Sequence, residues 1–163
     1  MSALSNIPPQ AVLPLSAYDR EDLRRAASRF DQVYLYADCS RSTDKESVLA
    51  AIADGFGLPD YFGHNLDALF DCITDLKALQ RADKPGFVVV LEGLPDTADF
   101  GKTDRNALLD VFRDAADYFD DHDTAFRVFY SINRAAPGAA ATVKAPKAVK
   151  GDVAVRAAGT GKA

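Results

Sequence analysis

Apolar residues recur along residues 32–132 with two different periods, and this predicts strands and helices in alternation. Three short runs rich in β-branched and aromatic residues predict strands, and three stretches with apolar residues every three or four positions predict helices. The strands are expected at 32–38, 86–92 and 125–132, and the helices at 44–55, 66–80 and 104–119. The order β-α-α-β-α-β favours right-handed parallel connections. The expected fold class is therefore α/β, a three-stranded parallel sheet packed with helices.

Local signals predict where the helices begin and end. Ser42 or Thr43 is the expected N-cap of the helix at 44–55, and Gly55 and Gly57 are expected to end it. Asn65 is the expected N-cap of the helix at 66–80. The run GFVVVLE is the most hydrophobic of the chain and indicates a central strand buried on both faces.

Composition divides the chain into three parts. Residues 1–30 are a lead-in, rich in Pro and Ser at its start, in which 17–30 could form a short charged helix. Residues 31–133 carry the predicted domain. Residues 134–163 consist mainly of Ala, Gly, Pro and Lys without an aromatic residue, so a disordered basic tail is expected. The inner face expected for the short helix consists of Leu23, Ala26, Ala27 and Phe30.

The bulk composition is that of a globular protein. The chain has 163 residues, 48% of them hydrophobic and 26% charged, which fits one domain. No run of 18 uncharged apolar residues is present, so no transmembrane helix and no membrane partner are expected. The first residues lack a basic segment and contain three prolines, which is a poor signal peptide. A cytoplasmic location is therefore expected.

The charge is unevenly distributed. The whole chain has a net charge of −5, and residues 134–163 carry six cations against Asp152 alone, so residues 1–133 are near −10. An acidic body repels nucleic acid and attracts basic partners, although a merely solvated surface is the simpler interpretation. The basic tail could contact nucleic acid weakly, serve as a flexible extension, or fold back on the acidic body and compete with a basic partner.

Cysteine and histidine offer little for metal or redox chemistry. Cys39 and Cys72 lie far apart in the sequence, and two buried free thiols are favoured over a disulfide, which stays open. His64 and His122 are also far apart and no CxxC is present. Neither a metal site nor a cofactor is expected.

The helix expected from residue 66 has two distinct faces. A buried stripe is predicted at Leu66, Leu69, Phe70, Ile73 and Leu76. On another face Asp67, Asp71 and Asp75 follow at i, i+4 and i+8. Like charges at this spacing repel and Asp is a poor helix former, and only Asp67 is favoured by the helix dipole. The stripe therefore indicates either a binding surface for cations or a solvated face.

The loop before this helix contains further candidates. Tyr61 is an efficient interface residue, and of Tyr61 and Phe62 one is expected in the core and one outside. Gly63 permits a close backbone approach or a positive φ.

These residues carry a family resemblance. The pattern LPxYxGxNLDALxDCxT at 58–74 resembles the signature of the barstar family, intracellular inhibitors of secreted barnase-type ribonucleases, and LLDVFRDA at 108–115 is similar to the last helix of that family. The resemblance covers about 31–132. It implies that the loop and the acidic helix plug a ribonuclease active site, with Asp71 in the pocket for the substrate phosphate. The residues that match partner-contacting positions are Tyr61, Gly63, Asn65, Leu66, Asp67, Phe70, Asp71, Thr74 and Asp114.

The sequence departs from the family pattern at several of these positions. Phe70 and Leu76 stand where the family has Trp, Asp114 replaces a Glu, and His64 replaces a Glu in the loop. Changes of this kind tune the choice of partner, so the resemblance implies a basic barnase-type ribonuclease without identifying it.

The sequence therefore predicts an immunity-type ribonuclease inhibitor that is a monomer when free and not an enzyme. One alternative is a binding module of the same fold with a non-ribonuclease partner. Another is an enzyme in which His64, Asp67 and Asp71 form an acid–base or metal cluster.

Overall fold

The computed structural model describes residues 7–59, 65–78 and 85–133. Its sheet has four strands, all parallel, in the order β1-β4-β3-β2. The strands are β1 (Gln10–Pro14), β2 (Val33–Asp38), β3 (Gly86–Pro95) and β4 (Ala125–Asn133). The helices are α1 (Arg20–Arg29), α2 (Lys45–Phe56), α3 (Leu66–Thr74) and α4 (Lys102–Asp120), with a short 3-10 turn, η1 (Leu15–Ala17).

The sheet corrects the prediction of three strands. The fourth, β1, comes from the lead-in and pairs with β4 from Gln10 opposite Phe126 to Pro14 opposite Tyr130. Prolines at positions 9 and 14 weaken the strand pattern of this segment in the sequence. An edge strand tolerates proline, because one of its two sides pairs with no other strand and needs no N–H donors. Residues 7–30 thus belong to the same compact unit as the predicted domain.

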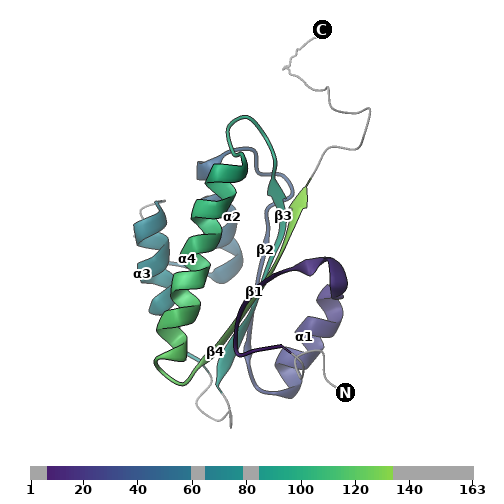
Figure 1. Cartoon of the computed structure of the whole chain (residues 1–163), viewed down its shortest axis with the longest axis vertical. Helices are drawn as coiled ribbons and strands as arrows, with labels where there is room; N and C mark the ends of the chain where they lie inside the picture. Colours follow the sequence, from purple (N-terminus) through teal and green to yellow (C-terminus); the bar gives the residue numbers. More distant parts are fainter. Residues whose placement is uncertain (1–6, 60–64, 79–84, 134–163) are drawn as a thin grey trace, which may run out of the picture. The chain divides into compact units, whose positions relative to one another are not determined.

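Helices cover both faces of the sheet (Figure 1). α1 lies on one face against β2 and β3, while α2 and α4 lie on the other and α3 packs on α4. Residues of β3 alternate between two cores. Phe87, Val89 and Leu91 face α2 and α4, and Val88 and Val90 face α1. All ten residues of β3 except Glu92 are buried, which confirms the expectation of a central strand buried on both faces.

Several predicted helix boundaries need correction. Asp44, not Ser42 or Thr43, caps α2, because its carboxylate accepts from the Ser47 amide at 2.9 Å while the Ser47 hydroxyl accepts from the Asp44 amide. Gly57 ends α2 in the left-handed conformation with φ +66°, as expected. Gly55 instead lies inside the helix, against the backbone of β2.

Two further expectations at helix ends were wrong. Leu23, Ala26 and Ala27 are buried as predicted, but Phe30 is 46% exposed because it lies beyond the last residue of α1. α3 ends at Thr74 instead of continuing, because the Leu76 amide bonds to the carbonyl of Ile73 and tightens the turn. Residues 79–84 lie outside the described part of the chain.

Both cysteine thiols are buried and free, so the disulfide left open by the sequence is not formed. Burial raises the pKa of the Cys39 thiol to about 12. None of the described helices is long and apolar enough to cross a membrane. The prediction of a disordered tail at 134–163 lies outside the described residues.

Candidate functional site

α3 presents one face to the core and another to solvent. Its buried residues are Leu69, Cys72 and Ile73, and Leu69 and Ile73 confirm part of the predicted stripe. Leu66, Phe70 and Leu76 are only partly buried, although each packs against the core. Cys72 was favoured as a buried thiol but not counted in the stripe, and its burial widens the buried face of the helix. The result is a helix anchored along one side, with the edges of Leu66 and Phe70 accessible.

The opposite face of α3 carries the acidic stripe. Asp67, Asp71 and Asp75 are all exposed, and no described Lys or Arg lies within ion-pair distance of any of them. Asp67 stands in the first turn, where the helix dipole stabilises a carboxylate. Asp71 and Asp75 stand near the C-terminal end, where the dipole opposes them. Burial raises the pKa of the neighbouring Cys72 thiol, and the negative charges of Asp75 and Asp71 raise it further.

Two predicted contact residues hold the ends of the helix. The Oδ1 atom of Asn65 accepts from the amide of Ala68 at 2.7 Å, which confirms the predicted N-cap. The Thr74 hydroxyl donates to the carbonyl of Phe70 at 2.9 Å and is 3.3 Å from that of Asp71. Asn65 remains exposed and Thr74 half-exposed, so both also belong to the accessible surface.

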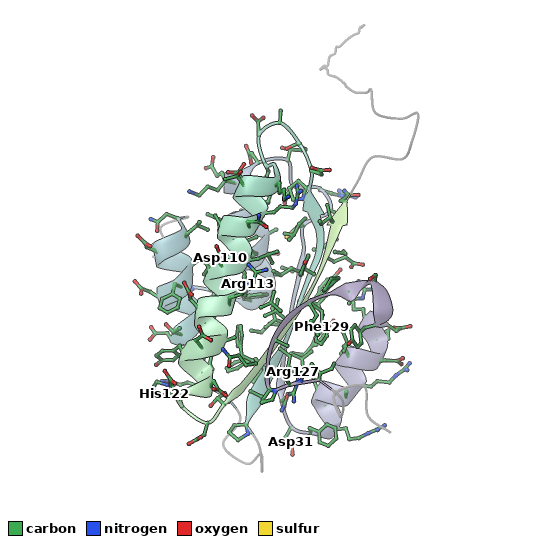
Figure 2. The ribbon with its side chains drawn as sticks, viewed as in Figure 1. Asp31, Asp110, Arg113, His122, Arg127 and Phe129 are labelled. Atoms are coloured by element: carbon green, nitrogen blue, oxygen red, sulfur yellow. The ribbon has the colours of Figure 1, made fainter. Side chains whose placement is uncertain are left out.

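Asp114 is the predicted contact residue on α4. α3 packs against α4, and Asp114 lies on the exposed side of that helix. Two neighbouring carboxylates on α4 already have partners within the protein. Asp110 pairs with Arg113 at 2.7 Å (Figure 2), and Asp117 accepts a hydrogen bond from Gln10. No described cation pairs with Asp114. The unpaired carboxylates of α3 and α4 could therefore receive cationic groups from a partner without first breaking an internal ion pair.

The sequence interpretation missed a groove beside this acidic face. A groove of about 320 Å³ lies between the C-terminal ends of α3 and α4. It includes Thr74 from the predicted contact set, and its opposite wall is formed by Tyr118, Phe119 and His122. The available signal was the spacing of Tyr118, one helical turn after Asp114.

The remaining predicted site residues lie outside the described part of the chain. These are Tyr61 and Gly63 in the loop, together with His64, on which the enzymatic alternative depended. Within the described ranges, no three His, Cys, Asp or Glu side chains are grouped so that they could hold a metal ion.

Comparison with known protein families gives one match. A family model described as Barstar (barnase inhibitor) matches residues 32–131, which span β2 through most of β4 and include α3 and Asp114. The search of curated proteins gave no match. The family match covers more than half of the chain. This chain therefore belongs to the barstar family.

Proposed function

We propose that this protein is an immunity-type inhibitor that occludes the active site of a basic barnase-type ribonuclease with α3, the loop before it and Asp114. The observation that carries the proposal is the row of exposed, unpaired carboxylates at Asp67 and Asp71, held on a helix whose other side is anchored in the core. Membership in a family described as barnase inhibitors supports the same function.

The chemistry of the target explains why carboxylates suit this task. A ribonuclease site binds a phosphodiester with Lys, Arg and His side chains. A row of carboxylates can occupy these cations in place of the phosphate, and bidentate bonds from Arg are both strong and geometrically specific. Because the helix is fixed before binding, little conformational entropy is lost when the complex forms. The inhibitor itself would contribute binding and no catalysis, and it would be a cytoplasmic protein that is a monomer when free.

The acidic stripe is electrostatically unfavourable for the helix that carries it, and this also supports a binding role. Asp71 repels Asp67 and Asp75 at i±4, and near the C-terminal end the helix dipole disfavours its charge. Lys or Glu in this position would serve a merely solvated face better or equally well. Such a local conflict is typical of a functional surface.

The test is inhibition of a basic barnase-type ribonuclease by the purified protein. Asp71→Ala should weaken inhibition about hundredfold or more, because it leaves partner cations buried without a counter-charge. Asp71→Asn keeps the shape and should lose nearly as much. Asp22→Ala is the matched control, because Asp22 is an exposed carboxylate on α1, across the sheet, and its removal changes the net charge equally.

Three outcomes decide the proposal. Loss of inhibition in both Asp71 variants and not in Asp22→Ala supports it. An equal effect of Asp22→Ala would mean that net charge alone matters, which contradicts the assigned face. Absence of inhibition by the folded protein would overturn the ribonuclease target and direct the search to a non-ribonuclease partner.

A further inference from the structure

The groove between the C-terminal ends of α3 and α4 adjoins the proposed inhibitory face. Thr74 belongs to both. Asp114 and Tyr118 lie one helical turn apart on α4, and His122 follows in the turn after the helix with its ring stacked on that of Tyr118. The groove therefore adjoins the proposed interface on both helices, at Thr74 on α3 and beyond Asp114 on α4.

The aromatic wall of the groove is exposed and fixed in position. Tyr118 is 36% exposed, and with Phe30 it is one of the two large apolar side chains that remain exposed among the described residues. Its ring stacks on the imidazole of His122, with ring centres 4.3 Å apart (His122 is labelled in Figure 2), and meets Phe119 edge-on. A rigid, accessible ring of this kind is a suitable platform for a planar side chain.

Three polar side chains that line the groove have already used their hydrogens, whereas Lys77, which also lines it, carries a donor-only ammonium group. The Thr74 hydroxyl donates to the Phe70 carbonyl, and the Thr124 hydroxyl donates to the His122 carbonyl at 3.1 Å. A carbonyl only accepts, so the 2.7 Å contact of His122 Nδ1 with the carbonyl of Tyr118 places a hydrogen on Nδ1. In the neutral imidazole Nε2 is then an acceptor. These three side chains therefore offer acceptors to a donor-rich occupant.

We propose that this groove binds an arginine side chain of the inhibited ribonuclease, stacked on Tyr118 and hydrogen-bonded to the acceptors of Thr74, Thr124 and His122. This inference rests on the proposed function and adds a contact to it. A guanidinium carries five donors and no acceptor, is planar, and stacks on aromatic rings. A groove of about 320 Å³ accommodates one such side chain. Asp114, one turn before Tyr118, adds an attractive charge.

The positive charge of Lys77 makes the proposal testable, because a cationic and an anionic occupant would respond to its removal in opposite directions. Lys77 is the cation among the described lining residues, and it is exposed. If the occupant is a guanidinium, Lys77→Ala removes a repulsion and tightens binding several-fold. If the occupant is an anion, the same substitution weakens binding.

The experiment measures the dissociation constant for a basic barnase-type ribonuclease by calorimetry. Tyr118→Leu retains an apolar side chain and removes the ring, and it should weaken binding roughly threefold to thirtyfold. Phe30→Leu is the control, an exposed aromatic residue at the end of α1, and should change nothing. Unchanged binding by Tyr118→Leu, or weakened binding by Lys77→Ala, would overturn the proposal.

A second measurement separates this inference from the proposed function. If the folded wild-type protein binds no such ribonuclease, the proposed function fails and the groove is tested alone by NMR titration with N-acetyl-arginine methylamide. Saturable shifts at Thr74, Tyr118 and His122, absent with the uncharged citrulline analogue, would support arginine binding. No shifts at these residues, or equal shifts with both compounds, would overturn it.

Discussion

The side-chain oxygen of Asn65 accepts a hydrogen bond of 2.7 Å from the backbone amide of Ala68, and this bond begins the helix that carries the acidic stripe. Asn65→Ala should therefore lower the free energy of unfolding by about 1 kcal/mol, whereas Asn65→Asp should retain most of it. Urea denaturation of the three proteins checks this. Weaker partner binding by Asn65→Ala with unchanged stability would show that Asn65 acts only by contact.

Gly55 lies where the backbones of α2 and β2 approach each other closely. A Cβ atom at this position would lie 2.2 Å from the carbonyl oxygen of Tyr36. Gly55→Ala should lower the free energy of unfolding by about 1–3 kcal/mol or more, although alanine is the better helix former. Gly57→Ala is the comparison, because no atom lies within 4 Å and only the backbone strain at φ +66° should cost about 1–2 kcal/mol. Equal stability of Gly55→Ala and wild type would contradict the close approach.

Leu23 connects the lead-in to the sheet. It is fully buried in the second core with Val88, Val90 and Phe129. Leu23→Ala should lower the free energy of unfolding by about 2–5 kcal/mol, because it leaves a cavity beside β3. Phe30→Ala, directly after the same helix, should stay within about 0.5 kcal/mol, because Phe30 is exposed. Chemical denaturation distinguishes the two, and a neutral Leu23→Ala would mean that α1 contributes little to the fold.

The raised pKa of Tyr36 predicts how the stability of the fold changes at high pH. Burial and a hydrogen bond from its hydroxyl to Glu92 raise the pKa of Tyr36 from 10.0 to about 12. The unfolded chain loses this proton near pH 10 while the folded chain keeps it, so the stabilisation is complete below pH 10 and is lost as pH rises towards 12. Tyr36→Phe should show a smaller loss of stability across this window in denaturation measured at several pH values. Identical pH profiles would contradict the assignment.

The unpaired carboxylates predict salt-dependent association. The rate constant for association with a basic ribonuclease should fall as ionic strength rises, because charges beyond the Debye length of about 10 Å at 0.1 M salt are screened. Asp114→Asn should flatten this dependence more than Asp22→Asn, which removes a charge across the sheet and already paired with Arg25. Stopped-flow measurements at several salt concentrations provide the comparison. Equal slopes for both variants would leave only the net charge as the cause.

Patterns in the sequence predicted the elements whose hydrophobic period is strong. β2, β3, β4, α2 and α4 lie within a few residues of their expected positions, and Asn65 begins α3 as expected. β1 was missed because a five-residue edge strand flanked by proline exists only through its pairing with β4. The end of α3 was overestimated because the apolar spacing continues to Leu76 although the hydrogen bonds do not.

The sequence by itself determined the acidic stripe, since the spacing of Asp67, Asp71 and Asp75 places them on one face of any α-helix. Tertiary structure alone decided that Asp117 on α4 has a partner, because Gln10, which bonds to it, lies more than a hundred positions away along the chain. It also decided that Thr74 meets Tyr118 and His122 across a groove. The spacing of residues within one helix is set by local backbone geometry, whereas contacts between helices depend on how the whole core packs.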